Sequence, residues 1–218
     1  MYSSITFSGT IIQLLPEKAI WIAESSTLFI ADLHFGKAAH FRKSGIPIPE
    51  PIHKHDLETL TALIKKYSPT DFYILGDLFH SDWNEQWESL NAFLSDFNHV
   101  RFHLVKGNHD VLPPLAYRQS LFQIHENPVE MGNLFLTHEP AKHIPEGKLN
   151  ICGHIHPGVR LYGKGRQSIR ISCFHQSENQ LILPAFGRFT GLSLVKRKAQ
   201  DHIYGISGEK VIKILYQE

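Results

Sequence analysis

Apolar runs of four to six residues alternate with helical patterns in the first half of the chain. Runs at residues 28–31, 72–75 and 100–105 are typical of buried strands. Between them, apolar residues at helical spacing predict one helix over residues 51–67, with Pro51 in its first turn, and a second helix within residues 83–97. This alternation of strand and helix predicts a largely parallel sheet.

The two ends of the chain show shorter, β-rich patterns. Runs at residues 11–15 and 19–22 are separated by turn residues and predict strands joined by short turns. Beyond His138 the apolar runs have no helical period and predict a second, mostly antiparallel sheet packed on the first. These runs are residues 159–162, 169–174, 181–183, 202–206 and 211–216. We therefore expect a single α/β domain over residues 1–218.

Composition agrees with one globular domain. The 218 residues are 42% hydrophobic and 20% charged, which is ordinary for a chain that buries a sizeable core. We find neither a leader-like start nor the roughly 18 consecutive apolar residues of a membrane span, so we expect a cytoplasmic protein that does not contact membranes. Cys152 and Cys173 are too few for a disulfide framework and are expected to be buried small residues.

Charge is distributed unevenly along the chain. Residues 1–139 carry 10 basic and 16 acidic side chains, whereas residues 140–218 carry 12 basic and 5 acidic ones. A basic half attracts a polyanion such as nucleic acid, although a solvated basic face explains the same numbers equally well.

Polar residues that bind metals or move protons follow five of the apolar runs. They are Asp32 and His34, Asp77 and His80, Asn108 with His109 and Asp110, His138, and His154 with His156. Because ligands of open α/β folds bind where strands end, we expect these side chains to meet at one edge of a sheet. Unrelated turns explain this ordered spacing poorly.

Seven of these residues are candidate metal ligands: Asp32, His34, Asp77, Asn108, His138, His154 and His156. One ion with four to six donors would leave several of them buried and unpaired, whereas two ions that share Asp77 would use all seven. Nitrogen and oxygen donors without a thiolate favour Mn, Fe, Zn or Co over Ca or a closed structural Zn site. Two ions about 3.5 to 4 Å apart polarise a phosphoryl group and hold a bridging hydroxide for in-line attack on phosphorus.

The remaining motif residues suggest catalytic and substrate-binding roles. His109 is expected either to donate a proton to the leaving oxygen or to stabilise the charge that develops there, and Asp110 to fix the tautomer of His109. His80 is expected either to line the pocket or to be a structural histidine.

A basic segment follows His34, and within it Lys37, Arg42 and Lys43 are expected to reach substrate phosphate. The alternative is a solvated loop with a short helix.

The ordered set Asp-x-His, Gly-Asp-x-x-His, Gly-Asn-His-Asp, an isolated His and Gly-His-x-His resembles the calcineurin-like metallophosphoesterases. This resemblance covers most of the chain and implies a four-layer α/β/β/α sandwich, with two mixed sheets flanked by helices. It implies one metal on Asp32, His34, Asp77 and His156, and a second on Asp77, Asn108, His138 and His154. It gives His109 the role of catalytic acid. Many members read Gly-Asp-x-x-Asp where this chain has His80.

Within that family, residues 31–49, 76–81 and 184–187 resemble the bacterial DNA ligase-associated metallophosphoesterases. This resemblance implies a Mn-dependent DNA endonuclease in DNA repair, with DNA as substrate, a DNA ligase or helicase as partner, and a homodimer as a further possibility. The short spacings from His109 to His138 and from His138 to His154 leave little room for a lid, and an open cleft suits a nucleic-acid strand.

Two other functions remain open at this stage. One is a phosphoesterase or pyrophosphohydrolase that acts on a small nucleotide or sugar nucleotide. The other is a non-catalytic binding scaffold, like the retromer subunit that resembles this fold with a degraded metal site, and the intact ligand set argues against it.

Overall fold

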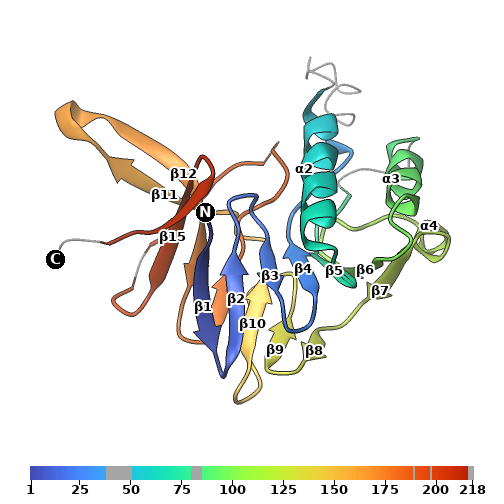
Figure 1. The fold of residues 1–218 in the computed structure, drawn as a ribbon, viewed down its shortest axis with the longest axis horizontal. Helices are drawn as coiled ribbons and strands as arrows, with labels where there is room; N and C mark the ends of the chain where they lie inside the picture. Colours follow the sequence, from blue (N-terminus) through green and yellow to red (C-terminus); the bar gives the residue numbers. More distant parts are fainter. Residues whose placement is uncertain (38–50, 80–84, 189, 197, 216–218) are drawn as a thin grey trace.

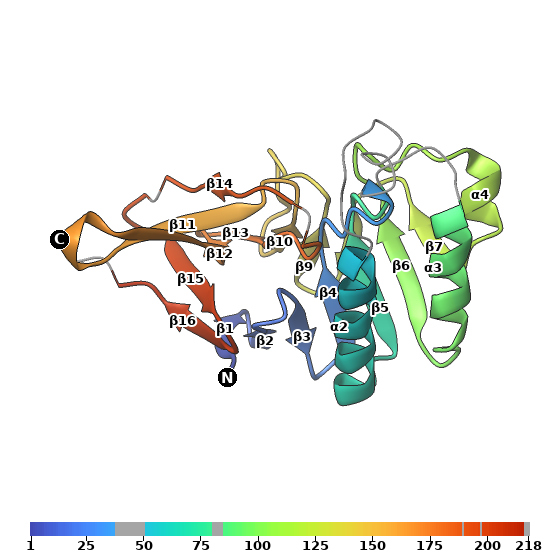
Figure 2. The same cartoon turned by 90° about the horizontal axis from the view of Figure 1, so that it is seen from above.

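The computed structural model describes residues 1–37, 51–79, 85–188, 190–196 and 198–215, except for the side chains of residues 51–53 and 166. Two β-sheets lie face to face and α-helices pack beside one of them (Figures 1 and 2).

The first sheet holds the N-terminal strands in sequence order. They are β1 (Ser3–Phe7), β2 (Thr10–Leu14), β3 (Ile20–Ile22), β4 (Thr27–Ile30), β5 (Asp71–Leu75), β6 (Arg101–Val105) and β7 (Phe122–His125). Strands β4 to β7 are parallel, as the sequence predicted, but β1 to β4 are antiparallel. The short connections between β1 and β4 explain this difference, because a parallel pair needs a crossover of a dozen residues or more.

Three α-helices cover the outer face of this sheet: α2 (Pro51–Tyr67), α3 (Glu85–Ser95) and α4 (Pro114–Arg118). The predicted bounds of α2 are confirmed, and α3 lies within the second predicted helix. Leu63 of α2 and Trp87 of α3 are buried in one cluster with Phe72 and Phe102 of the sheet. Trp87 is therefore a core residue, whereas Trp83 lies outside the described residues.

The second sheet is mixed. Its strands are β8 (Val129–Met131), β9 (Leu134–Leu136), β10 (Leu149–Cys152), β11 (Pro157–Tyr162), β12 (Ser168–Gln176), β13 (Gln180–Ile182), β14 (Ser193–Leu194), β15 (His202–Ser207) and β16 (Lys210–Lys213). The sequential hairpins are antiparallel, as predicted, while β10 runs parallel to β9 and β13. The 3₁₀ turn η1 (Lys164–Arg166) joins β11 to β12.

The core between the sheets is apolar. Phe29 and Leu75 of the first sheet share a buried cluster with Ile151 and Phe174 of the second. The α/β class with two mixed sheets is thereby confirmed. All three described α-helices pack on the first sheet, so no α-helix among these residues covers the outer face of the second, where β11, β12 and β15 bury a small cluster of their own.

No helix in the described part of the chain is both long and apolar enough to cross a lipid bilayer.

A polar contact ties the starts of β5 and β6 together. The Asp71 carboxylate accepts hydrogen bonds of 2.8 and 2.6 Å from the Arg101 guanidinium and lies 2.9 Å from Nε2 of His103. The Arg101 hydrogen bond is the main reason why the pKa of Asp71 falls to about 2. A carboxyl whose pKa is depressed in the folded state stabilises the protein above its unfolded pKa and loses this contribution as pH falls through its folded pKa.

We expect Asp71→Asn to lower the free energy of unfolding by about 1 kcal/mol at pH 7, a small effect because Arg101 is solvent-exposed. Urea unfolding should show this difference narrowing between about pH 4 and about pH 2, where wild-type Asp71 is protonated. Asp96→Asn, at an exposed aspartate, is the control. A difference that stays constant down to pH 2 would contradict this role.

Candidate metal centre

The predicted ligands lie on loops that follow strands of both sheets. Asp32, Asp77 and Asn108 come after β4, β5 and β6, whereas His138 and His154 come after β9 and β10. The expectation of a single sheet edge was therefore wrong, because β9 and β10 belong to the second sheet. The ligands still meet, since the inter-sheet core brings these strand ends together.

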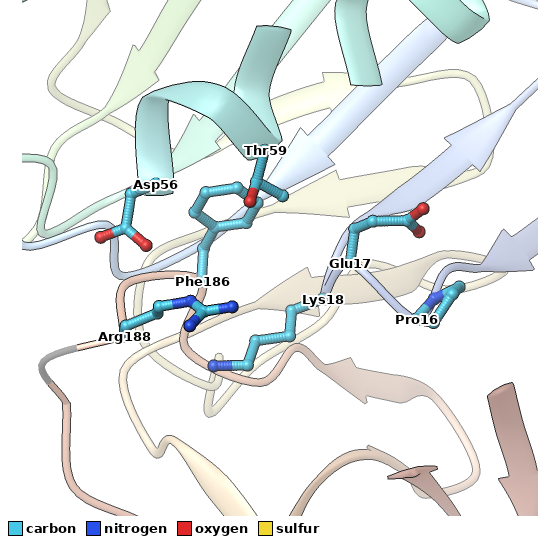
Figure 3. A pocket seen from close by; sticks show the side chains of 7 residues that line it. All are labelled: Pro16, Glu17, Lys18, Asp56, Thr59, Phe186 and Arg188. Atoms are coloured by element: carbon cyan, nitrogen blue, oxygen red, sulfur yellow. The ribbon is translucent and has the colours of Figure 1, made fainter. Parts of the chain in front are cut away.

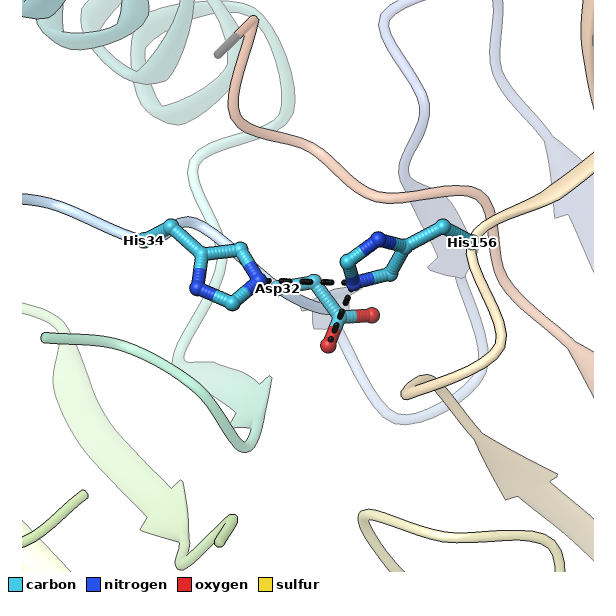
Figure 4. Close-up of side chains that lie close together, drawn as sticks. All are labelled: Asp32, His34 and His156. Carbon is cyan, nitrogen blue, oxygen red and sulfur yellow. Dashed lines mark hydrogen bonds and ion pairs between the residues drawn. The ribbon is translucent and has the colours of Figure 1, made fainter. Parts of the chain in front are cut away.

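Asp32, His34 and His156 form the first group, with ligand atoms within 4.8 Å of one another. Nε2 of His156 lies 3.4 Å from Oδ1 of Asp32 and 3.3 Å from Nε2 of His34. Figure 4 shows the two rings turned toward the same space above the carboxylate. Asp32 and His34 are buried.

Asp77, His138 and His154 form the second group, and their ligand atoms also lie within 4.8 Å of one another. Nε2 of His138 lies 3.1 Å from Nδ1 of His154 and 3.0 Å from Oδ1 of Asn108, so Asn108 joins this group.

Asp77 faces both groups. Its Oδ1 lies 3.4 Å from Nε2 of His138, and its Oδ2 lies 3.8 Å from Nε2 of His34. A carboxylate that offers one oxygen to each side has the geometry of a bridging ligand. The structure thus brings together all seven predicted ligands around Asp77.

The donor set fits two divalent cations. Two buried carboxylates without a cation are costly, and imidazole nitrogens that converge at 3.1 to 3.3 Å present lone pairs to a shared position. Nδ1 of His138 lies 3.0 Å from the Leu75 carbonyl oxygen, so Nδ1 carries the proton and Nε2 is left as a donor to metal. Nitrogen and oxygen ligands suit Mn, Fe or Zn.

The ligand loops have an unusual backbone. Five ligand residues adopt positive φ, a conformation that few non-glycine residues take: Asp32 (54°), His34 (49°), Asp77 (50°), His154 (68°) and His156 (52°). Main-chain hydrogen bonds hold the first two loops in place, from Asp32 N–H to the Gly76 carbonyl at 3.1 Å and from His34 N–H to the Asp77 carbonyl at 2.8 Å. Such local strain persists only where the surroundings impose it, and it is typical of functional sites.

Glycines allow the ligands to approach the neighbouring backbone. A Cβ at Gly153 would lie 2.5 Å from Oδ2 of Asp32, one at Gly107 would collide with Asp77, and one at Gly76 would collide with the ring of His138. This explains why a glycine precedes the ligand in the Gly-Asp, Gly-Asn and Gly-His motifs.

His109 lies at the rim of the centre. Its backbone N–H donates to Oδ1 of Asp77 at 3.0 Å, its ring centroid is 5.9 Å from that of His34, and the residue is exposed. The predicted proton donor is therefore placed where it can reach a substrate.

Asp110 makes different contacts from those expected. Its carboxylate accepts hydrogen bonds from the N–H groups of Gly107, Leu78 and Phe79 at 2.8, 2.9 and 3.2 Å. Burial raises the pKa of Asp110 to about 6, although the hydrogen bonds from the N–H groups of Gly107 and Phe79 partly oppose the shift. Asp110 therefore ties two ligand loops together, a contact that the sequence analysis did not predict.

Of the predicted substrate-binding residues, Lys37 is half-buried, and its N–H donates to the His34 carbonyl at 3.3 Å. This bond places Lys37 beside the first ligand group. Arg42, Lys43 and His80 lie outside the described residues.

Both cysteines are free and buried, as predicted. Burial raises the pKa of each thiol, that of Cys173 to about 12. Although Cys152 directly precedes Gly153, neither thiol supplies a thiolate at neutral pH.

A groove of about 620 Å³ beside the second ligand group escaped the sequence analysis. Asn108 and His138 line it together with Lys106, Lys142 and His143. Lys106 directly precedes the Gly-Asn-His-Asp motif, and Lys142 and His143 follow His138 within five residues. The proximity of these residues to the motifs is the signal in the sequence that could have indicated the groove.

Comparison with known proteins gives consistent results. A family model described as calcineurin-like phosphoesterase matches residues 25–177. The solved structure of Pseudomonas putida nuclease MPE is 27% identical, with a TM-score of 0.79 over 98% of this chain and 100% of that one. Yfce, a phosphoesterase from E. coli, is 17% identical, with a TM-score of 0.44 over 86% of this chain and 97% of that one. No curated protein matches the chain.

We expect Gly153→Ala to weaken metal binding by about 10- to 100-fold, the range for disturbing the surroundings of a ligand, because the added methyl displaces the Asp32 carboxylate. Titration calorimetry with Mn²⁺ and metal analysis after dialysis measure the effect. Gly191→Ala is the matched control, since a methyl there meets nothing within 4 Å. Equal metal affinity in both variants would show that the Asp32 position does not control binding.

Proposed function

This chain belongs to the calcineurin-like phosphoesterase family and is a metal-dependent phosphoester hydrolase, and from that premise we propose that it is a two-metal phosphodiesterase that cleaves DNA. The observation that carries the proposal is the position of Asp77, with one oxygen facing each ligand group. The likeness to a bacterial nuclease over almost the whole chain supports DNA as the substrate. We extend the proposal to DNA repair in the cytoplasm, with a DNA ligase or helicase as partner.

Each ligand group would hold one divalent ion, with Asp77 shared between them. Bound Mn²⁺, Fe²⁺ or Zn²⁺ ions supply Lewis acidity and lower the pKa of coordinated water. We propose Mn as the metal, because carboxylate and amide oxygens together with imidazole suit it.

His109 would act on the leaving group. Its backbone is fixed through the hydrogen bond to Asp77, and its ring stands at the exposed rim next to His34. A ring in that place can hand a proton to the leaving oxygen of a phosphodiester that lies across the centre.

The surface around the centre supports a polyanionic substrate. Lys106, Lys142 and His143 line the groove beside the second ligand group. A groove of about 620 Å³ that lies open to solvent accommodates a nucleotide unit of a longer strand.

The hairpin of β11 and β12 adds a second basic surface. Arg160 and Arg170 are directly opposite each other across the two strands, and both are exposed. Like charges in this position destabilise a sheet, and a bound polyanion relieves their repulsion. Tyr162, two residues after Arg160 and thus on the same face, is 77% exposed and offers a ring for base stacking.

A phosphoesterase of small nucleotides is the second candidate, because the same groove is large enough for a single nucleotide. A substrate panel with and without Mn²⁺ separates the two functions. We expect nicking of plasmid and cleavage of single-stranded oligonucleotides. Rapid turnover of nucleotides and small diesters without any cut in DNA would favour the second candidate.

We expect His109→Ala to keep both metals and to slow turnover by roughly 10² to 10⁴, the range for losing a general acid. Asp77→Ala is the contrasting variant, because it removes oxygens that face both groups and should lose metal and activity together. Metal content and single-turnover rates are measured side by side. Unchanged turnover in His109→Ala would remove its proposed role.

We expect the double variant Arg160→Gln/Arg170→Gln to bind DNA with a shallower salt dependence, its log–log slope smaller by about 1.5 to 2. Fluorescence anisotropy in EDTA, which prevents cleavage, measures binding over a range of salt concentrations. Lys65→Gln/Lys210→Gln removes two other exposed charges and is the control. An identical slope in both double variants would exclude the hairpin from the DNA surface.

A further inference from the structure

A second cavity, of about 390 Å³, lies between α2, the turn that joins β2 to β3, and the segment after β13. Its walls include Lys18, Asp56, Phe186 and Arg188 (Figure 3). None of these residues is a predicted ligand or part of the groove described above. We call this cavity the Lys18–Arg188 pocket.

Two cations point into the Lys18–Arg188 pocket. Figure 3 shows the ammonium group of Lys18 and the guanidinium group of Arg188 turned toward the same space. Among the residues that the structure describes, no carboxylate oxygen lies within 4.0 Å of either group. Burial lowers the pKa of Lys18, the charge of Asp56 partly opposes this shift, and the charge of Arg188 adds to it. Both cations would therefore gain from an anion placed between them.

The two acidic side chains at the pocket are oriented elsewhere. Oε1 of Glu17 lies 3.8 Å from the ammonium of Lys66, and Figure 3 shows the Glu17 carboxylate directed away from Lys18. Asp56 lies beside the backbone N–H of Arg188, and burial raises the pKa of its carboxyl to about 6. Neither acidic group fills the space between the two cations.

Lys18 adopts a backbone conformation that is energetically unfavourable for lysine. Lys18 has a φ of 62°, in a turn closed by hydrogen bonds from Leu15 N–H to the Ala19 carbonyl at 2.8 Å and from Lys18 N–H to the Leu15 carbonyl at 3.1 Å. Glycine or asparagine adopts this conformation more readily than lysine does. A lysine in such a position is consistent with a role for its charge.

The segment that carries Arg188 also contacts the metal centre. Phe186 N–H donates to the Ala31 carbonyl at 2.8 Å, and Gly187 N–H donates to the Asp32 carbonyl at 3.1 Å. The pocket thus lies beyond β4, on one side of the ligands, while the groove with Lys106 lies beside β6 and β7, on the other. Cationic side chains flank the centre on both sides.

We propose that the Lys18–Arg188 pocket binds a phosphate group and that, given the proposed function, this group is a backbone phosphate of the DNA strand away from the bond that is cut. A guanidinium engages two phosphate oxygens at once, and the ammonium adds a point charge. A terminal monophosphate or free inorganic phosphate has the same chemistry, and the experiments below distinguish these sources.

Acetylation of lysines, read by peptide mass spectrometry, reports occupancy of the pocket without any catalysis. The probes are a cleavage-resistant phosphorothioate oligonucleotide and inorganic phosphate, each added to the Mn²⁺-loaded protein. We expect the oligonucleotide to reduce acetylation of Lys18 several-fold and to leave the exposed Lys210 unchanged. Equal protection by inorganic phosphate at the same phosphate concentration would contradict the proposal that the bound phosphate group belongs to a DNA strand. If neither probe changes the acetylation of Lys18, the proposal that the Lys18–Arg188 pocket binds a phosphate group is wrong.

Kinetics of Lys18→Asn and Arg188→Gln provide the second test, since asparagine tolerates the backbone of residue 18. We expect KM for oligonucleotides to rise about tenfold in each variant, as for loss of one charge-assisted contact, with kcat unchanged. Hydrolysis of bis(p-nitrophenyl) phosphate should stay at the wild-type level, as it should in the control Lys65→Gln. Equal losses on both substrates would show a structural effect and overturn the proposal. If wild-type protein hydrolyses only the small diester, the proposed nuclease function fails, while the acetylation assay still decides the pocket.

Discussion

Packing between the two sheets is the constraint on which the metal centre depends, because neither sheet carries a complete ligand set. The first sheet supplies Asp32, His34, Asp77 and Asn108, and the second supplies His138, His154 and His156. The apolar core that joins Phe29 and Leu75 to Ile151 and Phe174 fixes the distance between the strand ends. Because protein interiors are closely packed, the two sheets do not slide past each other gradually, and the ligand groups are held at a defined spacing. The glycines that precede the ligands let the loops close over this junction.

Patterns that depend on neighbours in the chain could be predicted from the sequence. The bounds of α2, the strands β4 to β6 and the order of the ligands follow from apolar periodicity and motif spacing. Features set by distant contacts could not be predicted in this way. The apolar runs of β9 and β10 look like those of β4 and β5, and only the packed structure assigns them to the second sheet. Asp110 adjoins His109 in the chain, yet its carboxylate is used by the backbone of two loops. The five-residue helix α4 is too short to show a period.

The positions of the charged side chains also bear on how a substrate would reach the metal centre. Two carboxylates, Asp32 and Asp77, would neutralise only half the charge of two divalent ions, so a loaded centre keeps a positive charge that attracts a phosphodiester. Lys106 and Lys142 lie on one side of this centre, and Lys18 and Arg188 lie on the other. Lys37 adds a further cation beside the first ligand group. The basic excess after residue 139 includes the arginine pair of the β11–β12 hairpin. This distribution, rather than the small net charge of the whole chain, is what a polyanion would encounter.

The left-handed backbone of the ligand loops also narrows the choice of amino acids. Outside glycine, the residues that tolerate this conformation best are asparagine, aspartate and histidine. These same three side chains bind divalent metals through oxygen or imidazole nitrogen. The backbone conformation and the coordination of metal therefore favour nearly the same few amino acids at five positions: Asp32, His34, Asp77, His154 and His156. An amino acid that suits the backbone at one of these five positions is therefore also one that can coordinate a divalent metal.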